Sequence, residues 1–399
     1  MRKWVKTYLS RCSIFLMLIC YGCIEPFNAV FEDFQSALVI EGTITNELKL
    51  HQIVLTRTYE FEADGPSPET TANVRIIAGD GTTFSFEHVG DGVYVPSEAF
   101  AAQFGVDYQL EVDTQDGKSY ASEVVQLTSS TSIDDIRAER IINDDGQDGM
   151  GIFIDSFDPT GSSVNYRYEF IETYRVIAPE WFSDSLIGDP EGGCGVIRIP
   201  NRTDARICYP TDFSNALILT STANLNEDRV SNFMVRFVNR NNYIISHRYS
   251  ILVRQFVESN DAYTFFETLN EFSGSESLLS QTQPGFLQGN IFSKDDEDEK
   301  VLGFFNASSV SEKRLFFNYD DFYPGERLPP YVEDCKPSSP PIASTGGCII
   351  RPILEAGIGV YAGDNPEPRV GQGPYFIVSR VCGDCSVLGP EEQPDFWIE

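Results

Sequence analysis

The feature that most constrains the fold is a strict alternation of apolar and polar residues, interrupted by Asp-Gly pairs. In "ANVRIIAGDGTTFSFEH" apolar residues occupy every second position over 74–78, the chain can turn at Asp80-Gly81, and the alternation resumes over 84–86. "DYQLEVDTQDGKSYASEVVQL" repeats this arrangement around Asp116-Gly117. Alternation places the apolar side chains on one face of a strand, and Asp-Gly between two such runs is a strong hairpin signal. We therefore predict that residues 37–128 form a small antiparallel β-sandwich.

A polar stretch, "TSSTSIDDI", separates this block from a second β-rich block over residues 129–399. Runs such as "GMGIFIDSFDPTG", "VNYRYEFIETYRV" and "RYSILVRQFV" are typical of strands. The first block resembles transthyretin-like or carboxypeptidase-regulatory-like domains in "GDGVYVPS" followed by "FGVDYQLEV", and the second is similar to fibronectin-like or immunoglobulin-like domains. The expected fold is mainly β, with two antiparallel β-sandwich domains (transthyretin/immunoglobulin-like).

One segment of the second block has helical periodicity instead. Ser259 is a suitable N-cap, Asp261 lies in the first turn, and Gly274 can end the helix. Between them an apolar stripe recurs at helical spacing, at Ala262, Phe265, Phe266, Leu269 and Phe272. We predict a helix over about 260–273 whose stripe packs on the second sandwich.

The N-terminus has the pattern of an export signal. Residues 1–11 carry four basic side chains and no acid, and a short apolar run follows. The sequence Cys20-Tyr21-Gly22-Cys23 resembles a relaxed bacterial lipobox, although an aliphatic residue is expected where Cys20 stands. We predict that residues 1–22 are a lipoprotein signal peptide, that Cys23 is lipidated and anchors the chain, and that residues 23–36 form a tether. The alternative is a plain secretory signal cleaved nearby.

Six of the nine cysteines follow this segment, and an even number in an exported chain indicates disulfides. Sequence alone leaves the connectivity open, but proximity along the chain favours Cys194–Cys208, Cys335–Cys348 and Cys382–Cys385. The last pair, in "VCGDC", could instead be redox-active or half of a zinc site. No helix is expected after it and no second ligand pair is present, so a structural crosslink is favoured. We expect the Cys-rich tail, about 331–399, to be irregular and to wrap over the second domain.

The composition argues against several classes of function. A formal net charge of −31 disfavours binding to nucleic acid. The three histidines are far apart in sequence, and HExxH, GxSxG and Walker motifs are absent. "INDDGQDGMG" (142–151) fails the spacing of a calcium loop, and the acidic run "SKDDEDEK" (293–300) is typical of a solvated loop. We expect no cofactor, no metal site and no enzyme activity. A hydrolase that uses a pair of carboxylates is a weaker alternative.

Several segments resemble, in order, the outer-membrane lipoprotein family of the Bacteroidota known as domain of unknown function 4249. They follow the lipobox and the strand "LVIEGTIT": "CYPTDFSNALILTS", "AYTFFETLNEF", "PGFLQGNI", "VLGFFNASSVSEKRLFF" and the ending "CGDCSVLGPEEQPDFW". The resemblance covers nearly the whole chain after the signal, and its ending is the most specific part.

This resemblance implies an outer-membrane lipoprotein, on the periplasmic or the cell-surface face, that is often encoded beside a TonB-dependent transporter of the starch-utilisation type. The expected function is therefore that of a lipid-anchored accessory or binding protein in nutrient capture. The alternative is a structural or adhesive surface lipoprotein without a role in transport.

Overall fold

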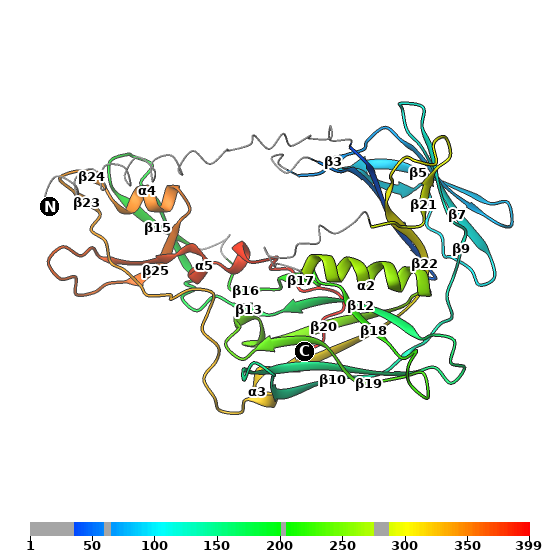
Figure 1. Ribbon diagram of the computed structural model, residues 1–399. Coiled ribbons are helices and arrows are strands. Elements are labelled where there is room, and N and C mark those ends of the chain that lie inside the picture. Colours follow the sequence, from blue (N-terminus) through cyan, green and yellow to red (C-terminus); the bar gives the residue numbers. More distant parts are fainter. Residues whose placement is uncertain (1–35, 60–64, 201–204, 275–286) are drawn as a thin grey trace, which may run out of the picture.

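The computed structural model describes residues 36–59, 65–200, 205–274 and 287–399 (Figure 1). One strand, β22 (Leu302–Asn318), organises this part of the chain. Its first half pairs in parallel with β1 (Leu38–Thr45), and its second half pairs antiparallel with β20 (Arg248–Val257). Because β22 belongs to both ladders, the N-terminal and C-terminal strands join in one sheet, which has fifteen strands among the described residues. The protein is mainly β as predicted, but the two blocks are not separate antiparallel sheets.

The N-terminal part is a curled sheet around its own core. After β1 it contains β2 (Ile53–Arg57), β3 (Ser67–Pro68), β4 (Asn73–Ala78), β5 (Thr83–Gly90), β6 (Val93–Pro96), β7 (Asp107–Asp113), β8 (Ser119–Ser122) and β9 (Val125–Gln126). Both predicted Asp-Gly hairpins are confirmed, since β4 pairs with β5 and β7 with β8. Gly81 and Gly117 adopt φ of +91° and +87°, which a residue with a side chain rarely adopts.

Residues far along the chain complete this curled sheet. Strand β21 (Ile291–Ser293) pairs with β8, and the side chain of Asn290 pairs with the backbone of Phe305 on β22 through bonds of 2.7 and 2.9 Å. Phe305 and Ala307 belong to the same core cluster as Ile40 and Leu110. The boundary predicted at residue 128 therefore does not enclose the N-terminal part. Without the later strands, β1 and β8 would be sheet edges with unpaired backbone N–H and C=O groups. Pairing with β22 and β21 satisfies these groups.

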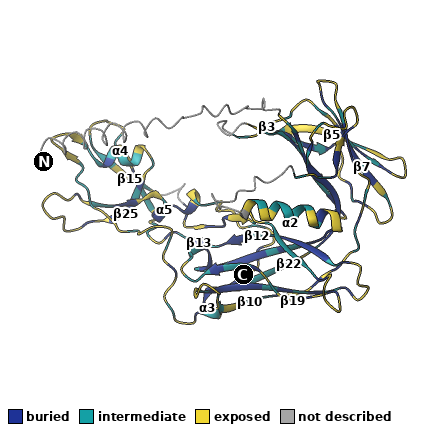
Figure 2. Ribbon diagram, viewed as in Figure 1, coloured by how far each residue is buried: buried dark blue, intermediate teal, exposed yellow. Residues whose placement is uncertain are grey.

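The C-terminal part has two layers that face each other across a second core (Figure 2). One layer consists of β20, the second half of β22, β12 (Asn165–Tyr174), β17 (Thr211–Phe213) and β18 (Ile218–Ser221). The other is a three-stranded sheet of β10 (Ile133–Ile142), β11 (Asp148–Phe157) and β19 (Arg229–Asn239). In "INDDGQDGMG", residues 143–147 form the turn between β10 and β11, where Asn143 N–H donates to the Gln147 carbonyl at 3.0 Å.

The predicted helix is confirmed as α2 (Asn260–Gly274), with the Ser259 hydroxyl accepting from the Ala262 N–H at 3.1 Å. The helix lies on the outer face of the layer that contains β12 and β22 (Figure 1). Ala262 is fully buried, whereas Phe265, Phe266 and Leu269 are only half-buried. The stripe therefore covers the sheet only in part and leaves aromatic surface beside it.

The tail contains more regular structure than predicted. The short helices η1 (Tyr243–Ile245) and α3 (Tyr319–Phe322) precede the tail and border the second core. The tail itself contains β23 (Ala343–Ser344), β24 (Gly347–Cys348), α4 (Ile350–Glu355), β25 (Gly359–Asp364), β26 (Tyr375–Ser379), α5 (Arg380–Gly383) and η2 (Cys385–Val387). Helix α4 and β25 pack on a hairpin from the middle of the chain, β14 (Asp184–Gly188) with β15 (Val196–Pro200). The short pair β13 (Val176–Ile177) and β16 (Ile207–Cys208) connects this small module to the layer that contains β12 and β17.

All six cysteines of the described residues form disulfides, but each of the three predicted pairings is wrong. The bonds join Cys194 to Cys348, Cys208 to Cys385 and Cys335 to Cys382. Proximity along the chain misleads because the tail folds back on the middle of the sequence, so Cys348 and Cys385 bond to Cys194 and Cys208. The third bond, Cys335–Cys382, lies within the tail and joins residues 47 positions apart. Cys382 and Cys385 bond to different partners, which also excludes a redox bond between them in this structure.

Candidate functional site

A hollow on the described surface lies where the N-terminal sheet, helix α2 and the outer face of β12 and β20 meet. Two adjoining cavities, of about 640 and 410 Å³, share Arg167, Glu169, Leu217 and Arg254. We call their combined lining the junction groove. Its remaining members include Glu41, Lys49, Leu50, Gln52, Phe213, Phe256, Phe265, Phe266, Leu269 and Phe304. Strands and a helix supply most of these residues, so their positions are set by regular structure.

Strand periodicity explains why charged residues reach this face. On β12 the tyrosines at positions 166 and 168 point into the second core, so Arg167 and Glu169 point outward. Their antiparallel partners on β20 are Phe256 and Arg254. Outward residues of neighbouring strands therefore meet as cross-strand pairs on the floor of the groove.

Aromatic rings form one wall of the junction groove. Phe265 of α2 lies 4.9 Å from Phe304 of β22, measured between ring centroids. The Arg167 guanidinium lies over Phe256 at 4.1 Å and over Phe266 at 5.1 Å. Such cation–π contacts hold the rings and the charge in one arrangement.

Arg167 belongs to an ion pair that is almost completely buried. Its Nε donates to Glu258 Oε1 at 2.7 Å, and the side chain of Glu258 has no exposed surface. Glu258 Oε2 accepts further bonds from Asn306 at 2.7 Å and Ser308 at 2.6 Å. Burial alone would lower the pKa of Arg167, but the charges of Glu258 and Glu169 and their hydrogen bonds together outweigh it, so the pKa is raised. The floor therefore carries a charge that is fixed in place.

A second arginine fixes the N-terminal wall to this floor. Arg254 Nη2 donates to Glu47 Oε2 at 2.5 Å, and Glu169 and Glu312 approach the same guanidinium at 3.5 and 3.8 Å. Burial by itself would raise the pKa of Glu47, but Lys49 at 2.7 Å and Arg254 lower it below its ordinary value.

Asn46, next to Glu47, adds two backbone bonds to Val310. Its side-chain oxygen accepts from the Val310 N–H at 2.8 Å, and its amide donates to the Val310 carbonyl at 3.4 Å. The two parts of the protein are therefore held in register by polar contacts as well as by β22, and the groove is shaped before any ligand arrives.

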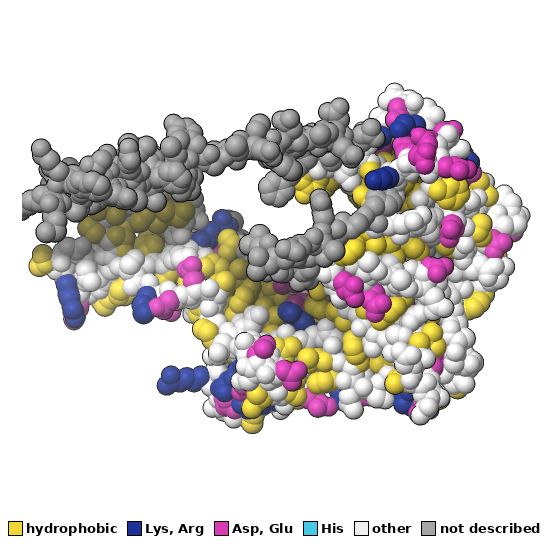
Figure 3. Space-filling model, in the orientation of Figure 1, with side chains coloured by type: hydrophobic (Ala, Val, Ile, Leu, Met, Phe, Trp, Pro, Cys, Tyr) yellow, Lys and Arg dark blue, Asp and Glu magenta, His cyan; other side chains and the backbone are white. Residues whose placement is uncertain are grey.

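The surface around the groove carries both acidic and apolar side chains. Figure 3 shows Asp and Glu side chains scattered among hydrophobic ones on the face that contains helix α2. Of the residues that line it, Leu50 is 50% exposed and Phe213 is 69% exposed. Exposed apolar side chains beside a hollow are a common sign of a contact surface.

The residues singled out from the sequence have different outcomes. Cys23 and the predicted signal lie outside the described residues, so the lipid anchor stays a prediction. The histidines are not brought together, and within the described ranges there is no cluster of three His, Cys, Asp or Glu side chains placed to hold a metal ion. The described part of the chain contains no helix with the length and apolar character needed to cross a bilayer.

Sequence reasoning missed Arg167 and Arg254 altogether. Each stands in an alternating strand, where an outward charge is ordinary, so no local signal distinguishes them. The helix stripe was a usable signal, because it includes Phe265, Phe266 and Leu269, which line the groove. Three of the segments that carry the family resemblance, which include Phe213, Phe265 and Phe304, converge on the junction groove.

Comparisons with known proteins bear on the family but not on the activity. No curated protein matches the chain. A family model described as Domain of unknown function (DUF4249) matches residues 24–314. That match includes every residue that lines the junction groove, but it stops before the ending "CGDCSVLGPEEQPDFW", the part of the sequence whose resemblance to the family is most specific. Since the match covers most of the sequence, the chain belongs to the DUF4249 family, a domain of unknown function.

Proposed function

We propose that the protein is a lipid-anchored binding protein of the bacterial outer membrane, which holds its ligand in the junction groove and works beside a TonB-dependent transporter. The observation that carries the proposal is the groove itself. Half-buried aromatic rings and a few fixed polar groups in a concave site are the usual composition of a binding pocket. On the architecture, we propose that the two cores correspond to two sandwich units, transthyretin-like and immunoglobulin-like, fused through β22.

The cysteine chemistry supports the cellular location. Disulfides persist in oxidising compartments such as the bacterial periplasm and the cell surface. The three bonds of this chain join distant segments and involve every cysteine of the described residues. They therefore agree with the predicted export signal and with lipidation at Cys23, and the Bacteroidota attribution rests on the resemblance of the sequence.

The electrostatics of the groove favour binding over acid–base catalysis. A catalytic acid needs a raised pKa, so that it still holds its proton near neutral pH. Instead, the pKa of Glu47 is lowered, and Glu169 and Glu258 are paired with Arg167. Carboxylates held in ion pairs can orient a ligand, but they are poorly placed to transfer a proton.

One observation favours the alternative of a structural or adhesive surface lipoprotein. Leu50 and Phe213, which line the groove, are 50% and 69% exposed. Apolar side chains at this density could contact another protein directly, without a small ligand between them. In the first proposal the groove holds a ligand, whereas in the alternative the partner protein contacts the groove directly and the groove must be empty for it to bind.

The membrane anchor is tested by cell fractionation. Cys23→Ala should move the protein from the membrane fraction to the soluble fraction, whereas Cys20→Ala should leave it bound. If Cys20→Ala releases the protein and Cys23→Ala does not, the wrong cysteine has been chosen. If neither releases it, the lipid anchor is refuted.

The role of the groove is tested by affinity purification of the protein from outer membranes in mild detergent. A transporter barrel should co-purify with the parent protein and with Ile142→Ala, a variant of an exposed residue on β10 outside the groove. Absence of a barrel from the parent sample would refute the partnership.

The same sample distinguishes the two readings. The double variant Phe265→Ala, Phe266→Ala should keep the barrel but lose saturable binding in a panel of oligosaccharides and peptides measured by thermal shift. If the double variant loses the barrel and the parent protein binds no member of the panel, the adhesive alternative is favoured.

A further inference from the structure

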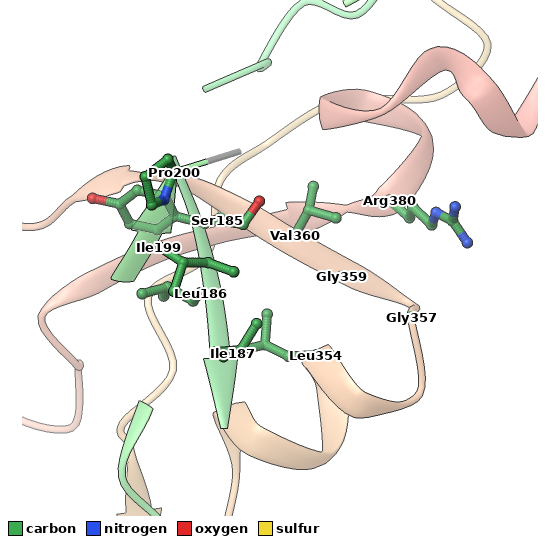
Figure 4. A pocket seen from close by; sticks show the side chains of 11 residues that line it. Ser185, Leu186, Ile187, Ile199, Pro200, Leu354, Gly357, Gly359, Val360 and Arg380 are labelled. Atoms are coloured by element: carbon green, nitrogen blue, oxygen red, sulfur yellow. The ribbon is translucent and has the colours of Figure 1, made fainter. Parts of the chain in front are cut away.

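A second cavity, of about 600 Å³, lies in the tail module and shares no residue with the junction groove. The β14–β15 hairpin forms one side of it, and α4 with β25 forms the other (Figure 4). Most of its walls are aliphatic, with Leu186, Ile187, Ile199, Leu354 and Val360 among the lining residues. Its volume lies within the range of about 300–1,000 Å³ that is usual for small-molecule sites.

One cation, Arg380, stands at an end of this cavity, away from Ile199 and Pro200 at the other end (Figure 4). The side chain of Arg380 is 46% exposed, and its Nε donates to Asp384 Oδ2 at 3.0 Å. Among the residues that the structure describes, Arg380 Nη1 and Nη2 make no hydrogen bond. Asp384 therefore binds one edge of the guanidinium, and the other edge can donate hydrogen bonds to a ligand.

The acid that holds Arg380 faces inward. Asp384 is 1% exposed, and its Oδ1 accepts from the backbone N–H groups of Ala205 at 3.2 Å and Ser386 at 3.0 Å. Burial alone would raise the pKa of Asp384, but these bonds and Arg380 lower it below its ordinary value. Because backbone donors satisfy much of the carboxylate, the outer edge of Arg380 keeps its attraction for an anion.

The walls of the cavity are fixed in the absence of a ligand. The disulfide between Cys194 and Cys348 joins the tip of the β14–β15 hairpin to β24. Arg351 of α4 also donates through Nη1 to the carbonyls of Gly193 at 2.9 Å and Asp189 at 3.3 Å. A ligand would thus enter a cavity that already exists, and little binding energy would be lost in forming it.

We propose that this cavity binds a single-chain anionic amphiphile, with the acyl chain against the aliphatic walls and the acid head group on Arg380. Each CH₂ that is buried against these walls removes apolar surface from water and so stabilises the complex. A guanidinium recognises a carboxylate or phosphate through parallel N–H bonds, which a neutral head group cannot replace. The proposal does not depend on the function of the junction groove.

The test uses dodecanoate below its micellar concentration, titrated into the purified protein by isothermal calorimetry. Saturable binding of one dodecanoate per chain is expected, with an affinity at least about tenfold above that of a neutral dodecyl glycoside, because one charged hydrogen-bonded contact contributes roughly that factor. Arg380→Gln should weaken dodecanoate binding by about tenfold, and Arg380→Lys should restore part of it. The matched control Arg369→Gln, at an exposed position of the same tail, should leave binding unchanged.

Ile187→Trp keeps the proposal testable if Arg380→Gln fails to fold. Ile187 is 38% exposed, so a larger ring can fill the cavity from its rim without entering the core. This variant should bind no dodecanoate while keeping the unfolding midpoint of the parent protein. The proposal is overturned if the parent protein does not bind dodecanoate saturably, or if the dodecyl glycoside binds equally well. It is also overturned if Ile187→Trp still binds, or if only phosphatidylglycerol vesicles bind and free dodecanoate does not.

Discussion

Removal of the Cys208–Cys385 bond tests both the pairing and the physical reason for it. These cysteines are separated by 177 residues, but the other two disulfides provide a shorter covalent path. From Cys208 the path crosses Cys194–Cys348 and then Cys335–Cys382, so the loop that remains to be closed has about 30 residues. Closing such a loop lowers the entropy of the unfolded chain by about 12 cal/mol/K, or about 3.6 kcal/mol at 25 °C.

The double variant Cys208→Ala, Cys385→Ala should therefore lose about 3–4 kcal/mol of unfolding free energy. Alanine suits both sites because both cysteines are fully buried. Urea unfolding followed by tryptophan fluorescence measures the loss, and thiol titration in denaturant counts free cysteines relative to the parent protein. No additional thiol is expected, since the two bonds that remain use the other four cysteines.

The control is Cys194→Ala, Cys208→Ala, which removes two cysteines that are neighbours in sequence. It should release two new thiols, from Cys348 and Cys385. If the bonds instead joined sequence neighbours, the two variants would exchange results. Two new thiols in the first variant, or a loss of stability below about 1 kcal/mol there, would refute the reasoning.

Three further predictions concern buried side chains. Trp397 is 6% exposed and packs edge-on against Tyr209 at 5.0 Å, so Trp397→Ala should lower the unfolding free energy by about 3–5 kcal/mol in urea. Phe396→Ala, at a 39% exposed neighbour, should cost clearly less, and equal losses would contradict an anchoring role for the tryptophan. Glu258→Gln leaves the buried charge of Arg167 without its main partner and should cost about 3 kcal/mol, measured in the same way, whereas an unchanged midpoint would show that the pair is not buried in solution. His51 is 1% exposed, and burial, helped by Lys49, lowers its pKa to about 4. The unfolded state therefore binds the proton first, so stability falls as pH decreases from 6.5 towards about 4, by about 3 kcal/mol for this group. In unfolding curves between pH 7 and 4.5, His51→Gln should show a shallower dependence on pH, and an identical slope would contradict this assignment.

The sequence by itself determined the local elements of the fold. Asp-Gly between alternating runs could form only a tight hairpin, and both hairpins are present as β4–β5 and β7–β8. The helix over Asn260–Gly274 was equally readable, because its cap at Ser259 and its apolar period lie within one short segment. The six paired cysteines could be inferred from their even number in a chain with a predicted export signal.

Only the tertiary structure decided how these elements meet. The partners of β22 are β1, more than 250 residues earlier, and β20, and no local pattern specifies a parallel pairing over that distance. The cysteine partners depend in the same way on how the tail folds back. The junction groove is a property of this assembly, since Lys49, Arg254 and Phe265 come from three separate segments. Local sequence encodes strands, turns and caps through short-range backbone preferences, whereas a site between segments arises from long-range packing, which a single sequence does not display.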